Sequence, residues 1–235
     1  MSAIATNLQA VKGRIESAAK AVGRGSGGIL LLAVSKTWPA ECVVAAVAGG
    51  QRAFGENYVQ EGVDKIARVA ALLGTGAPSL EWHFIGPLQS NKTRTVAEHF
   101  SWVHTIDRLK IAQRLSLQRP PHLGPLQVCV QVNVSGESSK NGCRPDAAEE
   151  LCRQVAELPH LRLRGLMAIP APAEDAAGQR RPLAQLRQLL QELQAVGLPL
   201  DTLSMGMSHD LEAAVAEGAT IVRIGTAIFG ERTYP

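Results

Sequence analysis

Aromatic residues are scarce in this sequence, at 4% of its 235 positions. An excess of charge is also missing, because the formal net charge is +3 and the basic residues are scattered. Proteins that bind single-stranded nucleic acid stack its bases on aromatic side chains and follow its backbone with a basic groove. We therefore expect that nucleic acid is not a partner of this protein.

Cysteine is equally sparse, and its four occurrences form no recognisable motif. They include no C-x-x-C pair and no nearby histidine at zinc-ligand spacing, which predicts ordinary reduced thiols and no metal site. The chain has no apolar run of membrane-spanning length, no signal-peptide pattern at its start and no phosphate-cradling P-loop motif. We expect a cytoplasmic protein without a membrane partner.

A strong feature that is present is the stretch Ile29–Lys36, which reads ILLLAVSK and is followed by Thr37-Trp38-Pro39. A short unbroken apolar run is typical of a strand that is buried on both faces, as in a parallel sheet. Because side chains alternate along a strand, Lys36 shares a face with Leu32 and Val34. The lysine is therefore expected at the carboxyl end of a buried strand, where open α/β sheets and β/α barrels place their chemistry.

The rest of the chain repeats this arrangement. After an amphipathic helix at the start, eight short strands alternate with helical stretches. This pattern predicts an α/β protein with a single parallel (β/α)8 barrel of the TIM type, spanning residues 1–235 as one domain with an extra N-terminal helix. A doubly wound open sheet is the alternative.

Three local predictions accompany this fold. Leu126–Val134 alternates clearly, so Val128 and its valine neighbours should face the helices while Cys129 faces inward. Pro170–Pro182 is expected to be an exposed loop. A helix over Ser208–Ala216 should be capped by Ser208.

Lys36 has two interpretations. A lysine at a strand end usually extends its amine into water and marks the limit of the core. The alternative is a desolvated amine that forms an imine with a carbonyl compound. The neighbouring strand ends are needed to choose between them.

Arg223 is the first such neighbour, because it lies inside the strand Ile221-Val222-Arg223-Ile224 and is expected to point inward. A buried guanidinium must be satisfied by acceptors. A structural ion pair with an internal carboxylate is the alternative to a role in a binding site.

The turns after the last two strands add glycines and hydroxyls: Ser204, Gly206, Ser208, Gly225 and Thr226. In β/α barrels these turns commonly hold a phosphate, although ordinary turn and cap chemistry also explains each residue alone. Met167 should face inward as core filler or against a flat ring. His83 more often serves as a satisfied buried histidine than as a catalyst.

A lysine amine, an inward arginine and a phosphate cup together suit a phosphorylated aromatic aldehyde. The stretches AVSKTWP, FGENYVQE, WHFIGPLQSNK, GLMAIPAP, LSMGMSHDLEAAVAEGAT and VRIGTAIFG closely resemble the pyridoxal 5′-phosphate homeostasis proteins, the YggS/PROSC family. The resemblance runs from Leu30 to Gly230. One departure is His209-Asp210, which replaces the acidic pair common after the GMS motif.

This resemblance implies an alanine-racemase-like barrel that holds pyridoxal 5′-phosphate (PLP) as a Schiff base on Lys36. It also implies that the phosphate lies around Ser204 and Gly225-Thr226 and that Arg223 faces the pyridine nitrogen. The residues implied to line the ring pocket are Asn57, His83, Met167 and Ser208.

The function implied by the resemblance is intracellular PLP homeostasis and supply by a non-catalytic, monomeric protein, with PLP-dependent apo-enzymes as recipients. Two alternatives remain: a PLP-dependent amino-acid racemase of the alanine racemase barrel type, and a Schiff-base aldolase. The racemases carry a further β domain, and this sequence ends a few residues after its last motif. The motif match argues against the aldolase.

Overall fold

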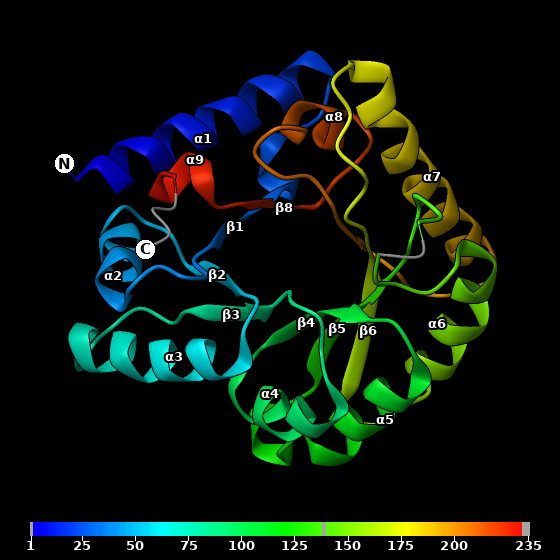
Figure 1. Ribbon diagram of the computed structural model, residues 1–235, viewed down its shortest axis with the longest axis horizontal. Helices are drawn as coiled ribbons and strands as arrows, with labels where there is room; N and C mark the ends of the chain where they lie inside the picture. Colours follow the sequence, from blue (N-terminus) through cyan, green and yellow to red (C-terminus); the bar gives the residue numbers. More distant parts are fainter. Residues whose placement is uncertain (1, 138–139, 232–235) are drawn as a thin grey trace.

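Eight parallel strands close into a barrel in chain order in the computed structural model, which describes residues 2–137 and 140–231 (Figure 1). Closure is made by β1 and β8, which pair from Leu30↔Ile221 to Ala33↔Ile224. The predicted closed barrel is confirmed, and the open-sheet alternative is wrong. The strands are β1 (Leu30–Val34), β2 (Ala53–Glu56), β3 (Glu81–Phe84), β4 (Trp102–Ile106), β5 (Leu126–Gln131), β6 (Leu161–Met167), β7 (Thr202–Ser204) and β8 (Ile221–Ile224).

The helices form a ring around the barrel (Figure 1). They are α1 (Ala3–Ala21), α2 (Ala40–Ala48), α3 (Val59–Leu73), α4 (Thr93–His99), α5 (Leu109–Gln118), α6 (Ala148–Ala156), α7 (Ala176–Ala195), α8 (Leu211–Ala216) and α9 (Thr226–Phe229). Within the described residues, β8 is followed by the single four-residue helix α9, and α1 packs against α2, α8 and α9. The extra N-terminal helix therefore covers the part of the barrel that a short last helix leaves open.

Alternation along the strands separates two apolar layers. Val128 and Val130 of β5 belong to the large core between the sheet and the helices, whereas Cys129 belongs to a second cluster inside the barrel. The predicted alternation of this strand is confirmed. The inner cluster consists of Leu32, Val34, Ala53, Ile85, Trp102, Cys129, Met167 and Ile221.

Two of the local predictions fail at element boundaries. Pro170–Pro182 is not wholly a loop, because α7 begins at Ala176 and includes Pro182. The Asp175 side chain caps this helix by accepting a hydrogen bond from the Gly178 N–H at 2.8 Å, a capping signal that outweighs the proline-rich composition. Ser208 is not a helix cap, since α8 begins at Leu211. It lies instead in the turn between β7 and α8.

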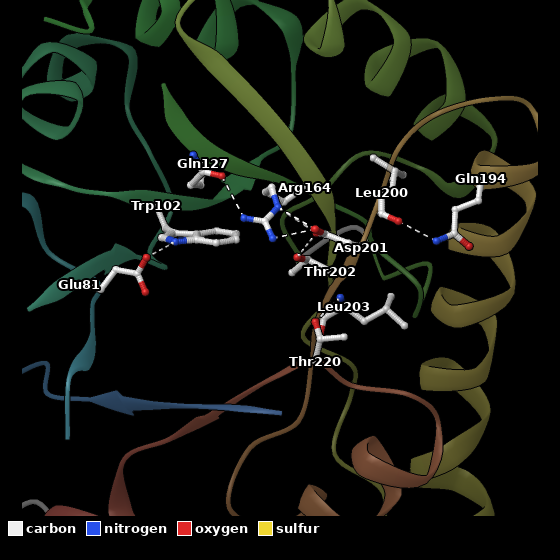
Figure 2. Close-up of polar contacts among 10 residues, drawn as sticks. All are labelled: Glu81, Trp102, Gln127, Arg164, Gln194, Leu200, Asp201, Thr202, Leu203 and Thr220. Carbon is white, nitrogen blue, oxygen red and sulfur yellow. Dashed lines mark hydrogen bonds and ion pairs between the residues drawn. The ribbon is translucent and has the colours of Figure 1, made fainter. Parts of the chain in front are cut away.

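A group of polar and aromatic side chains lies at the amino end of the barrel (Figure 2). Arg164 makes a double ion pair with Asp201, with its Nη2 2.7 Å from Oδ2, and its guanidinium lies 5.0 Å from the centroid of the Trp102 ring. The Trp102 indole N–H donates to Glu81 Oε1 at 2.9 Å. These contacts join side chains of β3, β4 and β6 to Asp201, the residue before β7, at this end of the barrel.

Across the described ranges, no helix is both long and apolar enough to cross a membrane. Over the same residues, the His, Cys, Asp and Glu side chains form no group of three or more that suits a metal ion. The four cysteines are free thiols.

Candidate functional site

A cavity of about 210 Å³ opens at the carboxyl ends of the strands. Larger hollows lie elsewhere on the protein, including one of about 560 Å³ beside the segment 133–136. The smaller cavity is the candidate site because it combines a strand-end lysine with a buried arginine. It is lined by Val34, Lys36, Asn57, Ile85, Ile169, Met207, Ser208, His209, Arg223, Gly225 and Thr226.

Lys36 is half-buried and follows β1 on the inward side, beyond Leu32 and Val34 of the inner cluster. The next residue, Thr37, has a φ of 68°, which is unusual for a β-branched side chain. Its backbone N–H donates to Glu61 Oε1 at 2.5 Å. The turn that carries Lys36 is therefore held in a costly conformation by a carboxylate of α3.

A buried ionic cluster supports this turn from the outside of the barrel. The Lys65 ammonium donates to the Ser35 carbonyl oxygen at 2.6 Å, to Glu56 Oε1 at 2.7 Å and to Glu61 Oε1 at 2.8 Å. The side chains of Lys65 and Glu56 are 5% and 0% exposed. Burial raises the pKa of Glu56, and the charge of Lys65 opposes that rise. One lysine thus joins β1, β2 and α3 beside the candidate site.

Arg223 lies on the inner side of β8 and is 4% exposed. Its Nη1 donates to the carbonyl oxygen of Ser204 at 2.5 Å and to its hydroxyl at 2.8 Å, and its Nη2 donates to the Ala168 carbonyl oxygen at 2.8 Å. Burial lowers its pKa to about 10, against the opposing charge of Asp210, so Arg223 is a cation at neutral pH. Its acceptors are neutral, and no carboxylate within 2–137 or 140–231 forms an ion pair with it, in contrast to the structural alternative considered above.

Two glycine turns form the wall next to Arg223. Gly206 has a φ of +94°, and a Cβ there would lie 2.4 Å from that of Ala214. A Cβ on Gly225 would lie 3.2 Å from the carbonyl oxygen of Val34. These close approaches bring the Ser208 and Thr226 segments to the cavity.

Asn57 reaches the opposite wall because of Gly86. A Cβ on Gly86 would lie 2.0 Å from the Asn57 carbonyl oxygen, so the β2–α3 turn can occupy its position only above a glycine. The side-chain Oδ1 of Asn57 is buried and accepts no hydrogen bond from any residue of the described ranges. An oxygen of this kind is suited to a donor on a ligand or a water molecule.

The variant Gly86→Ala is expected to displace Asn57 and to lower the free energy of unfolding by about 3 kcal/mol, the upper part of the usual cost of overpacking. Urea unfolding measures the loss, and amide chemical shifts report the displacement. The control is Gly13→Ala, because nothing lies within 4 Å of the added methyl group and alanine favours the helix interior. An equal loss in both variants would contradict this explanation.

Six of the residues implied by the sequence line the cavity: Lys36, Asn57, Ser208, Arg223, Gly225 and Thr226. His83, Met167 and Ser204 do not line it, although all three are fully buried inside the barrel. The His83 ring stacks on Trp102 with centroids 5.3 Å apart, and its Nδ1 lies 2.9 Å from Nε2 of His104. Alternation predicted which face these residues occupy, but not how far below the cavity they lie.

The sequence did not point to three residues that support the site. Glu56 and Lys65 form the ionic cluster beside the Lys36 turn, and His104 lies between His83 and Ser204 below the cavity. Glu61 and Lys65 are spaced for a pair on one turn of α3, which was a usable signal. His104 follows Trp102 by two residues, so strand alternation would have placed it inside the barrel.

Known proteins are similar to this chain in sequence and in fold. The family described as alanine racemase, N-terminal domain, matches residues 2–233. The pyridoxal phosphate homeostasis protein of Pseudomonas aeruginosa is 60% identical over 234 residues, covering 100% of this chain and 98% of the relative. The protein of the same name from Escherichia coli K12 is 56% identical over 234 residues, covering 100% and 99%.

Solved structures are also similar to this chain. PipY of Synechococcus elongatus, solved with PLP bound, superimposes with a TM-score of 0.84 at 38% identity and covers 97% of this chain and 100% of its own. Alanine racemase from Corynebacterium glutamicum has a TM-score of 0.70 at 17% identity, covering 97% of this chain and 60% of its own, which shows a shared fold. From the full-length identity and the family match, this chain belongs to the pyridoxal phosphate homeostasis protein family.

Proposed function

We propose that this protein binds PLP in the strand-end cavity, holds it as a Schiff base on Lys36 and takes part in intracellular PLP homeostasis. The observation that carries the proposal is that Lys36 and the buried cation Arg223 line one cavity. The relatives named pyridoxal phosphate homeostasis proteins, and the PLP-bound PipY, support the choice of ligand.

The residues of the cavity fit this group. PLP supplies an aldehyde, and the Lys36 amine is the nucleophile that a Schiff base requires. Arg223 has five N–H donors, of which three are used by Ser204 and Ala168, so two are left for an acceptor such as the pyridine nitrogen. Ser208, Gly225 and Thr226 would hold the phosphate, and Asn57 would contact the edge of the ring.

The proposal gives a supporting role to three residues that do not line the cavity: His83, Met167 and Ser204. They would support the cofactor from below, because they are buried under the cavity that holds it. The protein would act as a single cytoplasmic domain over residues 1–235 and as a monomer, and would release PLP to PLP-dependent apo-enzymes. Residues 1, 138–139 and 232–235 lie outside the described part of that domain.

Two features favour a carrier over a racemase. A pyridine nitrogen that accepts a hydrogen bond from Arg223 stays unprotonated and is then a weaker electron sink. Racemisation also needs an acid and a base on opposite faces of the substrate α-carbon. Besides Lys36 and Arg223, the one titratable side chain that lines the cavity within the described ranges is His209, which is exposed.

The expected result is that the PLP-loaded protein exchanges the α-hydrogen of alanine for deuterium no faster than free PLP at the same concentration. Proton NMR in deuterated water measures this exchange. His209→Ala is a control that should leave the rate unchanged. Exchange at least about a hundredfold above free PLP, the lower range for a positioned acid or base, would mean that the protein is an enzyme.

If the proposed supply role is right, mixing the PLP-loaded protein with a PLP-dependent apo-enzyme should restore the activity of that enzyme. A scavenger of free PLP separates direct transfer from release into solution. Failure to restore activity with or without the scavenger would contradict the supply role while leaving PLP binding intact.

A further inference from the structure

A line of polar side chains crosses the inside of the barrel from Arg223 to the amino end. Arg223 Nη1 lies 2.8 Å from Ser204 Oγ, which lies 2.7 Å from Nδ1 of His104. His104 Nε2 lies 2.9 Å from Nδ1 of His83, and His83 Nε2 lies 3.4 Å from Oε2 of Glu81. The two histidines and Ser204 are fully buried, whereas the Glu81 side chain is 46% exposed.

The hydrogens in this line can be assigned from its two ends. Burial lowers the pKa of both His83 and His104, so each ring is neutral at neutral pH and carries one N–H. Arg223 can only donate, and an ionised Glu81 can only accept. One direction fits every member: Arg223 donates to Ser204, Ser204 to His104 Nδ1 and His104 Nε2–H to His83. The His83 Nε2–H then faces the Glu81 carboxylate, which lies at ion-pair distance and makes no hydrogen bond to it.

The opposite direction fails at both ends. An unprotonated His83 Nε2 would face the Glu81 carboxylate, so two acceptors would oppose each other. Ser204 Oγ would then accept from both His104 and Arg223, and its hydroxyl hydrogen would be buried without an acceptor among the described residues.

Glu81 is held in place to act on His83. Its Oε1 accepts the indole N–H of Trp102 at 2.9 Å, as Figure 2 shows, which leaves Oε2 for His83. Trp102 is stacked on His83, with ring planes 5° apart, and the Arg164 guanidinium lies 5.0 Å from the centroid of the Trp102 ring. A carboxylate offers two acceptor atoms here, and an amide offers only one.

We propose that Glu81 is a positioning residue for the cavity at the other end of the barrel, because its carboxylate fixes the hydrogen-bond direction of the line His83–His104–Ser204–Arg223. The hydroxyl hydrogen of Ser204 then points away from Arg223, and a lone pair of its oxygen holds the guanidinium. Arg223 offers the cavity only N–H donors, so a ligand atom beside it must accept a hydrogen bond. This inference concerns the protein's own residues and does not depend on the proposed function.

Nitrogen NMR of the ligand-free protein, labelled with ¹⁵N in histidine, tests the direction. The expected result is that His83 and His104 are both protonated at Nε2 and unprotonated at Nδ1, in about tenfold excess or more. A proton on Nδ1 of either residue in the wild-type protein would overturn the proposal, even if no variant folds.

The variant Glu81→Gln tests the role of the carboxylate. The single amide oxygen can accept from Trp102 or from His83, and the NH₂ group opposes the other donor, so both histidine tautomers should become populated. Asp201→Asn is the matched control, since it removes a carboxylate at the same barrel end without touching the line, and it should keep the wild-type tautomers. Unchanged tautomers in Glu81→Gln, or equal changes in both variants, would show that Glu81 does not set the direction.

Discussion

Replacing Lys36 with Arg is expected to lower the amount of PLP retained after gel filtration by at least about tenfold, which corresponds to about 1.4 kcal/mol of binding free energy. Arginine keeps the positive charge and much of the length of lysine. Its guanidinium stays protonated in proteins and is not an amine nucleophile. The variant therefore separates covalent attachment from simple electrostatic attraction.

The measurement is the visible spectrum of the PLP-loaded protein before and after gel filtration. Lys92→Arg is a matched control, because Lys92 is an exposed lysine that lines a neighbouring hollow rather than the strand-end cavity. If Lys36→Arg retains as much PLP as the wild type, or if Lys92→Arg loses as much, the assignment of Lys36 fails.

Replacing Lys65 with Met is expected to lower the free energy of unfolding by about 3–5 kcal/mol, the cost of leaving one partner of a buried ion pair alone. Glu56 would be left without its cation at 0% exposure of its side chain, and the Ser35 carbonyl oxygen would lose a donor. Because the Lys36 turn rests on this cluster, PLP affinity should fall as well.

The double variant Glu56→Gln/Lys65→Met provides the control for this prediction. Removing both charges should recover part of the loss, because a buried pair is often replaced by neutral groups at little cost. Urea unfolding of the wild type, both single variants and the double variant measures the coupling between the two residues. A double variant less stable than Lys65→Met would contradict a charge-based explanation.

The pH dependence of Lys65→Met follows from the raised pKa of Glu56. A carboxyl group with a higher pKa in the folded state binds more protons when folded, so stability increases as the pH falls. Without Lys65 the pKa of Glu56 rises further, and the deficit of the variant should shrink from pH 8 towards pH 5. A deficit that is independent of pH would indicate lost packing instead.

The sequence predicted the architecture well because a closed β/α barrel has strong periodic signals. Continuous apolar runs marked the doubly buried strands, as in β1, and alternation in β5 separated the inner from the outer face. Local chemistry was harder to predict. The helix α7 begins directly after its cap, Asp175, and contains Pro182, although the proline- and alanine-rich composition of this segment is typical of a loop.

The candidate site was predictable where an inward-facing residue lies at or just beyond the carboxyl end of a strand, as Lys36 does after β1. Depth along the barrel axis was not predictable. Ser204 ends a three-residue strand and was assigned to the phosphate, yet it lies under Arg223 and bonds to it. Partners from distant strands were also hidden: His104 and Ser204 are 100 positions apart in the chain and become neighbours only when the barrel closes.

The central claim is that Lys36 is the residue that holds PLP, and reduction of the PLP-loaded wild-type protein with borohydride tests it most directly. Reduction turns a Schiff base into a stable pyridoxyl amine, which peptide mapping by mass spectrometry can locate. We expect the pyridoxyl group on the peptide that contains Lys36, at a stoichiometry near one per chain. A modification spread over surface lysines, or concentrated on another lysine, would contradict the account.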